Sequence, residues 1–295
     1  MNAVLIVNPA ARQVAARPGL QDEVRSLLRS RGLSADLWLT TRAGEATDLA
    51  RQAAEEGREL VVVAGGDGTV NEAVNGLART ATALGVVPLG TGNVLGHYLG
   101  LAPGDLQAAC GLIAEGRRRR IDAGSINGRY FVCMAGVGLD AEVAARTGGP
   151  LKRCLGRYAF MLQFVVTVTR TRPWEFEGTL DGRAISGATW GVFLCNTAQY
   201  TWRVSMAPDA LEDDGQLEFV FLNACSKGDV LRAAANLFGR GKSAATQPNM
   251  QVLRGAHLAL KTSRETHWQV EGEVGGVTPV ACAVHPRAIT LISAA

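Results

Sequence analysis

Short apolar runs alternate with amphipathic segments through the first third of the chain. The runs expected to be strands lie at 3–7, 35–40, 60–63 and 84–89. Between them, apolar residues recur at helical spacing in 21–31, in a segment that ends near residue 56, and in 70–77. Strands that alternate with helices are typical of a doubly wound, mostly parallel sheet. We therefore predict an N-terminal α/β domain.

The pattern changes near residues 117–120, where four arginines stand in a row. Beyond them the expected strands lie at 130–134, 174–180, 191–195, 216–222, 257–261, 267–271 and 288–292, and the expected helices at 139–146, 155–169 and 227–238. This mixture predicts a second, mainly β, sandwich-like domain. We expect domains at 1–121 and 122–286, and leave open whether the last strand, 287–293, joins the first domain.

The composition favours a folded, cytoplasmic protein. Hydrophobic residues make up 47% and charged residues 19% of the 295, which is enough apolar material for a sizeable core. The net charge of +3 is too small to indicate a nucleic-acid partner. The chain opens in an apolar run without a basic leader, and no apolar stretch reaches the roughly 18 residues of a spanning helix. The six cysteines form no CxxC pair, so we expect buried free thiols.

A glycine-rich turn, Gly65-Gly-Asp-Gly-Thr69, joins the third expected strand to a helix. Its glycines let another molecule approach the backbone closely, and a strand–turn–helix of this kind offers N–H groups to a phosphate. The alternative is a tight turn that binds nothing. Asp67 and Thr69 argue against that alternative, because a carboxylate beside a phosphate requires a cation or a reacting proton to compensate it.

Other strands of the predicted sheet also end in polar or glycine residues. These are Asn8, Thr40 and the segment from Gly90 to Asn93. Ligands of open α/β sheets bind beyond the carboxyl ends of the strands. We therefore expect these residues and the glycine turn to form one site.

Two acidic stretches in the second half are candidates for chemistry. The loop 210–217 carries carboxylates that suit Mg²⁺, although this stretch alone favours a polar hairpin turn. The stretch 269–273 is expected to end a strand, with Glu271 and Glu273 on one face so that their carboxylates can converge. A carboxylate near a phosphate donor can accept the proton of an attacking hydroxyl.

Together these segments resemble the diacylglycerol kinase catalytic family, with sphingosine and ceramide kinases as relatives and NAD kinases and phosphofructokinases as more distant ones. The resemblance rests on residues 65–77 and 88–93, on Asn8-Pro9, on Thr40, and on the segments 121–140, 207–216 and 270–273. It covers nearly the whole chain. One difference is that Glu271 stands where the family has aspartate.

The resemblance implies an NAD-kinase-like or phosphofructokinase-like nucleotide domain and an ATP- and Mg²⁺-dependent kinase of a lipid hydroxyl, with its active site in a cleft between the domains. It implies Glu273 as the catalytic base and Asp67 as the residue that places the catalytic metal. It also implies a structural Mg²⁺ held by the Asp214 side chain and the carbonyls of Leu211 and Gln216. The nucleotide contacts that it implies are Asn8, Thr40, Gly65, Gly66, Asp67, Gly68, Thr69, Val70, Asn71, Thr91 and Asn93.

The expected partners are ATP and a diacylglycerol-like lipid, with transient contact to the inner membrane face; a homodimer is left open, and no nucleic acid is expected. The candidate membrane surface is a basic cluster beside apolar residues: Arg146, Lys152, Arg153 and Arg157. A solvated polar face is the more ordinary interpretation of that cluster. Two alternatives remain: a kinase of a soluble acceptor such as NAD or a sugar phosphate, and a non-catalytic binding protein. Segment 200–206 favours the binding protein, because the family resembled here has a glycine-rich run at that place and this chain does not.

Overall fold

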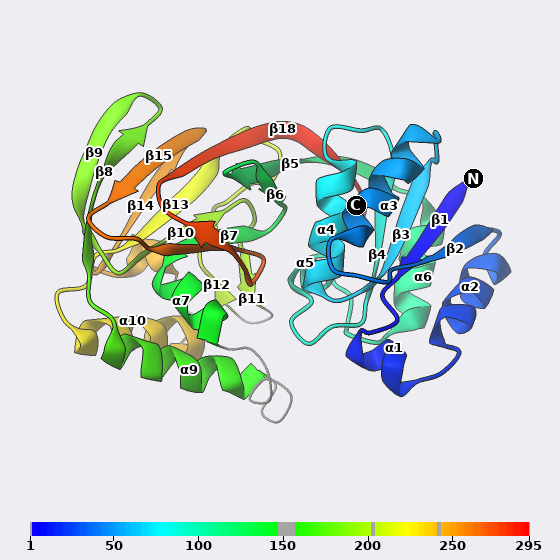
Figure 1. The fold of residues 1–295 in the computed structure, drawn as a ribbon, viewed down its shortest axis with the longest axis horizontal. Coiled ribbons are helices and arrows are strands. Elements are labelled where there is room, and N and C mark those ends of the chain that lie inside the picture. Colours follow the sequence, from blue (N-terminus) through cyan, green and yellow to red (C-terminus); the bar gives the residue numbers. More distant parts are fainter. Residues whose placement is uncertain (1, 147–156, 202–203, 241–242, 295) are drawn as a thin grey trace. The chain divides into compact units, whose positions relative to one another are not determined.

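The computed structural model describes residues 2–146, 157–201, 204–240 and 243–294. These residues form two compact units. Figure 1 labels their elements and colours the chain by residue number. One unit comprises Met1–Ala123 and Pro286–Ala295, and the other comprises Gly124–His285. The chain leaves the first unit within β5 (Arg118–Ile126) and returns to it within β18 (Val280–Ile292).

The first unit is built on a parallel sheet. Its strands are β1 (Ala3–Val7), β2 (Ala35–Leu39), β3 (Leu60–Gly65) and β4 (Ala83–Pro88), in the order β2-β1-β3-β4. The end of β18 adds a further parallel strand beside β4, so the last strand does return to this unit. Every residue of β1, β3 and β4 is buried, as in a sheet with helices on both faces. This confirms the predicted α/β fold.

Six helices belong to the first unit: α1 (Arg12–Ala16), α2 (Leu20–Ser30), α3 (Glu45–Glu55), α4 (Asp67–Leu77), α5 (Val94–Tyr98) and α6 (Leu106–Glu115). Helices α3 and α4 pack closely because small residues meet at their contact. Helix α3 buries Ala46, Ala50 and Ala53, and Gly76 of α4 lies directly against the α3 backbone.

The second unit is mainly β. One sheet has six strands in the order β14-β13-β10-β7-β16-β17. Their bounds are Met250–Gly255, Leu217–Leu222, Gly191–Cys195, Met134–Gly138, His267–Val270 and Glu273–Val277. The neighbouring pairs in this sheet are antiparallel. A sheet of this kind buries one face against a second layer.

The second layer contains β6 (Arg129–Phe131), β8 (Trp174–Leu180), β9 (Arg183–Thr189) and β15 (His257–Thr262), together with parts of β5 and β18. A single apolar cluster joins the two layers. Within it, the rings of Phe176 and Phe221 lie 5.1 Å apart, one from each layer. The predicted sandwich-like domain is therefore confirmed.

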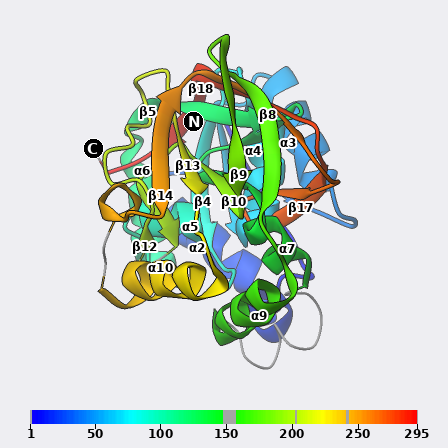
Figure 2. The same cartoon turned by 90° about the vertical axis from the view of Figure 1, so that its left-hand side faces the viewer.

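The helices of the second unit are α7 (Leu139–Arg146), α9 (Arg157–Arg170) and α10 (Lys227–Arg240), with a short 3₁₀ turn at Ala244–Thr246. Helices α9 and α10 contact each other and run side by side in Figure 2. A small separate ribbon pairs β11 (Gln199–Thr201) with β12 (Val204–Ser205).

The strand predicted at 267–271 is wrong at its end. Strand β16 stops at Val270, and β17 begins at Glu273. Between them Glu271 and Gly272 adopt left-handed φ angles of 50° and 86°, which reverse the chain in a two-residue turn. Glu271 and Glu273 therefore do not share the face of one strand, as the sequence analysis expected.

Another prediction needs correction. The strand expected at 130–134 is interrupted, because Val132 and Cys133 separate β6 from β7. Residues 118–120 of the arginine run lie in β5. The strands at 183–189 and 250–255 were missed, because mixed apolar and polar positions on half-exposed strands give little signal.

The described cysteines carry no disulfide, in agreement with the expected free thiols. Cys110, Cys133, Cys195 and Cys282 are buried, and Cys225 is exposed. Burial raises the pKa of Cys110 to about 11, so this thiol stays protonated at neutral pH. Buried protonated thiols act as small apolar side chains.

We expect Gly76→Ala to destabilise the first unit, because the new Cβ would lie 2.4 Å from the carbonyl oxygen of Thr47 and 2.8 Å from the Cβ of Ala50. Overpacking of this kind costs about 1–3 kcal/mol, whereas the higher helix propensity of alanine returns about 1 kcal/mol. The matched control is Gly111→Ala in α6, where the nearest atom lies 3.9 Å away. Thermal unfolding should show a lower melting temperature for Gly76→Ala only. Equal shifts in both variants would contradict the packing argument.

Candidate active site

The polar residues predicted to share a site lie at the carboxyl ends of the parallel strands. The side-chain amide of Asn8, after β1, donates to the hydroxyl of Thr69 in α4 over 3.4 Å. The backbone N–H of Thr40, after β2, donates to the carbonyl of Val7 over 3.0 Å. The ends of β1, β2 and β3 are thus tied to one another at this edge of the sheet.

Two glycine loops, Gly65–Thr69 and Gly90–Asn93, approach each other at the same edge. A Cβ on Gly90 would lie 2.6 Å from the Cα of Gly66, so only glycine fits there. The second loop is closed by Asn93, whose side chain accepts from the Gly90 N–H at 2.7 Å and donates to the Gly90 carbonyl at 2.6 Å. Asn93 is 3% exposed and takes a left-handed φ of 51°. The second loop is therefore rigid and fits closely against the first.

Asp67 fastens the two loops together. One carboxylate oxygen accepts from the N–H of Asn93 and the other from the N–H of Val94, each at 2.7 Å. Gly92 makes room for this contact, since a Cβ there would lie 2.5 Å from the carboxylate. The sequence analysis missed this bridging role. The glycines at 90 and 92, spaced around the carboxylate, are the signal that could have indicated it.

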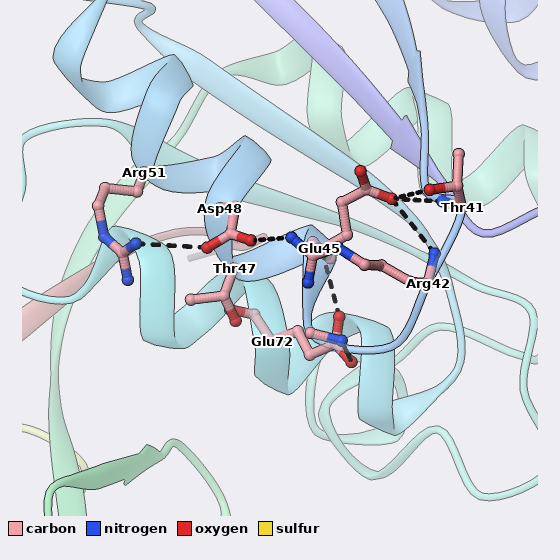
Figure 3. Close-up of polar contacts among 9 residues, drawn as sticks. Thr41, Arg42, Glu45, Thr47, Asp48, Arg51 and Glu72 are labelled. Atoms are coloured by element: carbon pink, nitrogen blue, oxygen red, sulfur yellow. Dashed lines mark hydrogen bonds and ion pairs between the residues drawn. The ribbon is translucent and has the colours of Figure 1, made fainter.

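The loop after β2 is held by a network of carboxylates, which Figure 3 shows. Glu72 of α4 accepts from the N–H groups of Gly44 at 2.8 Å and Ala46 at 3.2 Å. It therefore caps the N-terminus of α3 with a negative charge. Helix α4 begins at the glycine loop, and the N–H groups of a first helical turn have no intrahelical partner. The start of α4 is thus better placed than the start of α3 to bind an anion.

Further contacts in Figure 3 fix the same loop. Glu45 accepts from the backbone N–H of Thr41 and from its hydroxyl, the latter at 2.9 Å, and these bonds lower the pKa of Glu45. Arg42 pairs with Asp48 at 2.7 Å, and Asp48 also pairs with Arg51 at 3.5 Å. The loop that follows Thr40 is therefore held in one conformation.

The predicted nucleotide residues differ in their exposure. Val70 and Asn71 are buried in the first turn of α4, and Thr40 is 6% exposed. Gly66, Asp67 and Gly68 are partly exposed, and Thr91 is exposed. Part of each glycine loop is therefore accessible at this edge, whereas Thr40, Val70 and Asn71 are buried.

The predicted catalytic glutamate lies in the second unit, at the start of β17. Glu273 accepts from the Arg129 guanidinium at 2.6 Å, and its side chain is 47% exposed. Glu271 is held differently, because one of its oxygens accepts from the backbone N–H groups of Val132, Cys133 and Met134. Glu271 and Glu273 thus lie two positions apart in the sequence, but their carboxylates have different hydrogen-bond partners.

Arg254 contacts Asp214, the side chain expected to hold a structural metal. Asp214 pairs with the Arg254 guanidinium and also accepts from the backbone N–H of Gln216 at 2.9 Å. Arg254 also contacts Glu218, its cross-strand neighbour, at 3.3 Å. Burial raises the pKa of Glu218, and Arg254 opposes that shift. In this arrangement the guanidinium supplies a positive charge beside Asp214. A Mg²⁺ held by Asp214 and the carbonyls of Leu211 and Gln216 stays a prediction.

Asp67 fits a metal better than Asp214 does. Among the described ranges, no three His, Cys, Asp or Glu side chains are grouped so that they could hold a metal ion. Mg²⁺ in kinases is commonly bound by one or two carboxylates together with the phosphates of the substrate. The Asp67 carboxylate, beside the glycine loops, meets that requirement once a nucleotide supplies the other oxygens. The predicted metal residues Leu211, Asp214 and Gln216 lie before β13, which is three strands away from β16 in the sheet.

An apolar cavity lies between α9, α10 and the six-stranded sheet of the second unit. Phe164, Phe193, Leu237 and Phe238 are among the side chains that line it. Asp140 is the acidic side chain among the described residues of its lining, and it accepts from the amide of Gln269. The cavity measures about 30 Å³, which is room for one or two water molecules, so it is a small gap in the packing and not a preformed ligand site.

The membrane-surface prediction is only partly within the described residues. Lys152 and Arg153 lie outside them, and Arg146 pairs with Glu142 at 3.2 Å. Leu162 and Val165 of α9 are exposed apolar side chains, 51% and 46% exposed. In the part of the chain that the structure covers, no helix combines the length and apolarity needed to cross a bilayer.

Two family models match this chain. The diacylglycerol kinase catalytic domain matches residues 2–126, and the YegS C-terminal NAD kinase beta sandwich-like domain matches residues 133–293. A diacylglycerol kinase of Bacillus subtilis is 30% identical over 279 residues, covering 94% of this chain and 91% of the relative. A diacylglycerol kinase of Staphylococcus saprophyticus is 28% identical, with coverages of 94% and 90%.

Solved structures share the fold over nearly the whole chain. A crystal structure of a diacylglycerol kinase from Bacillus anthracis str. Sterne has a TM-score of 0.75 at 21% identity, covering 99% of this chain and 96% of that one. A second crystal structure from the same organism has a TM-score of 0.83 at 24% identity, with coverages of 99% and 95%. Both units of the chain therefore have counterparts of known structure.

The Asp214–Arg254 arrangement predicts that Mg²⁺ does not stabilise the unliganded protein. We expect the same melting temperature in EDTA and in millimolar Mg²⁺. Arg254→Met should lower the free energy of unfolding by about 1 kcal/mol, because the Arg254 and Asp214 side chains are both partly exposed. The variant should also become sensitive to Mg²⁺, since Asp214 and Glu218 lose their counter-charge. Arg232→Met, which removes a 72% exposed arginine in α10, is the control. A rise of several degrees for the unmodified protein in Mg²⁺ would instead support a metal at Asp214.

Proposed function

This chain belongs to the diacylglycerol kinase family and is in general terms a lipid kinase, and from this we propose its reaction. It transfers the γ-phosphoryl group of ATP to the hydroxyl of a diacylglycerol-like lipid. The observation that carries the ATP part of the proposal is the pair of glycine loops joined by Asp67. Close backbones and the first turn of a helix are a common way to bind phosphate groups. The loops would hold the phosphates through backbone N–H groups.

Asp67 would serve in two ways. It keeps the second glycine loop against the first. Its carboxylate would also hold Mg²⁺ together with the nucleotide phosphates. The metal, when bound, neutralises charge that develops on the transferred phosphoryl group. Phosphoryl transfer depends mainly on positioning and on charge neutralisation, so a rigid pair of loops suits it.

Glu273 would accept the proton of the lipid hydroxyl. As the bond between that oxygen and the γ-phosphorus forms, the bond from the γ-phosphorus to its bridging oxygen breaks, and the proton passes to the Glu273 carboxylate. Its exposure supports this role, because an acceptor can reach it. Arg129 holds one oxygen of the carboxylate, and the other oxygen is the one we assign to the proton.

The apolar lining between α9, α10 and the sheet supports a lipid as the acceptor. The cavity itself measures only about 30 Å³, so α9 and α10 would have to move apart before an acyl chain could enter among these side chains. Leu162 and Val165 are exposed on α9, the helix that also contributes Phe164 to the cavity. We propose that this helix face contacts the membrane surface from which the lipid is taken.

We expect Glu273→Ala to lower kcat by roughly 10²–10⁴-fold, the range that general-base catalysis contributes, with the KM for ATP nearly unchanged. The assay measures labelled γ-phosphate from ATP·Mg²⁺ in dispersed diacylglycerol, with NAD and a sugar phosphate alongside. Glu265→Ala, an exposed glutamate in the same unit, is the control and should keep full activity. Label in NAD or the sugar phosphate would contradict a lipid acceptor, and ATP binding without any labelled product would favour a binding protein.

We expect Asp67→Ala to weaken ATP binding by roughly tenfold or more, because two charge-assisted hydrogen bonds between the loops are lost. Titration calorimetry with a non-hydrolysable ATP analogue measures the affinity. The matched control is Asp105→Ala, which removes the N-cap of α6 and should cost about 0.5–2 kcal/mol of stability without changing ATP affinity. Equal losses of affinity in both variants would mean that Asp67 acts through stability alone.

A further inference from the structure

The turn that carries Glu273 is unusual in its residue type. Turns of this class favour asparagine or glycine at positions with left-handed φ angles, and here the first position is Glu271. A glutamate is disfavoured in that conformation unless its surroundings compensate it. The contacts of the Glu271 side chain therefore help to explain why the chain adopts this turn.

Residues 132–134 bind the Glu271 carboxylate with their backbone. One oxygen accepts from the N–H of Val132 at 3.0 Å, of Cys133 at 2.7 Å and of Met134 at 3.4 Å. The backbone N–H of Glu271 donates in return to the carbonyl of Met134 at 3.1 Å. Successive backbone N–H groups that converge on one carboxylate form a concave anion site, and bonds to a charged acceptor are the stronger ones.

The same short segment also contacts Glu273. Arg129, three residues before Val132, pairs with the Glu273 carboxylate at 2.6 Å. The segment is itself fixed from behind by Asn196, which donates to the Val132 carbonyl from its side chain at 2.7 Å and to the Cys133 carbonyl from its backbone at 3.0 Å. Asn196 is 1% exposed, so this support is part of the core.

A third contact holds the other half of the turn. The N–H of Gly272 donates to the side-chain oxygen of Gln269 at 2.6 Å, and the amide nitrogen of Gln269 donates to Asp140. Gln269 is 1% exposed. Both residues of the turn are thus bound, Glu271 by residues 132–134 and Gly272 by Gln269.

We propose that Glu271 is a positioning residue that places Glu273 for proton transfer, by anchoring the turn 270–273 to the backbone amides of residues 132–134. The inference rests on the proposed role of Glu273 as the base. Glu271 is not itself suited to that role, because protonation would weaken its bonds to three buried N–H groups. The charge that holds the turn and the charge that accepts the proton are therefore on different residues.

The first test is a double-mutant cycle in the lipid phosphorylation assay. Glu271→Gln removes the charge and should lower kcat by about tenfold or more with the KM for ATP within about twofold. In the Glu273→Ala background the same change should alter kcat by less than about twofold, because its effect passes through Glu273. Glu177→Gln, an exposed glutamate on β8, is the matched control and should leave kcat unchanged. Multiplicative effects in the double variant would overturn the proposal.

Two further measurements test the proposal independently of the double-mutant cycle. Amide hydrogen exchange at residues 132–134 should be faster in Glu271→Gln than in the unmodified protein, which can be measured without any activity. Glu271→Asp keeps the charge and should retain more of kcat than Glu271→Gln does; equal losses would contradict an anchor that depends on charge. If Glu273→Ala keeps its activity, the proposed base is wrong, whereas an active Glu271→Gln beside an inactive Glu273→Ala refutes the positioning role alone.

Discussion

The two hydrogen bonds that the Asp67 carboxylate accepts are the interaction on which the arrangement of the two glycine loops in the first unit depends. The carboxylate accepts two backbone N–H groups of the second glycine loop, and it lies in the first turn of α4. An ionised carboxylate without such partners would be unfavourable beside a phosphate site. The glycines that surround it follow from this contact, because Gly66 and Gly90 must touch and Gly92 must leave room for the carboxylate. The close approach of the two loops and the presence of glycine at positions 66, 90 and 92 are thus both explained by the contact of Asp67 with the second loop.

In the second unit, the turn at Glu271 and Gly272 is held by a side chain of the turn itself, that of Glu271. Glu271 and Glu273 are separated by one glycine, yet the reversal of the chain gives them different environments. Segment 129–134 contacts both, using backbone N–H groups for one and the guanidinium of Arg129 for the other. Because Asn196 ties this segment to the core, the exposed end of the turn is connected to a rigid interior.

Arg254 shows how a neighbouring strand can supply the charge that a loop requires. Glu218 and Arg254 face each other across β13 and β14, and the guanidinium extends to Asp214 in the preceding loop. A fixed cation of this kind satisfies the carboxylates without a metal ion, at the cost of holding a long side chain in one position. Loop 211–216 is thereby joined to the sheet through side chains of its own chain.

The sequence by itself determined the two-domain plan, because buried parallel strands such as Leu60–Gly65 are continuous apolar runs and helices keep their own period. It also determined the glycine loops, whose spacing is local. It did not determine the end of β16. There Glu271 adopts a left-handed φ angle, and its side chain is bound by backbone amides that are distant in the sequence. The partners of Asp67 and of Asp214, 26 and 40 residues away in the chain, were likewise decided by the tertiary structure. Local patterns specify elements, whereas contacts between distant residues depend on how those elements pack.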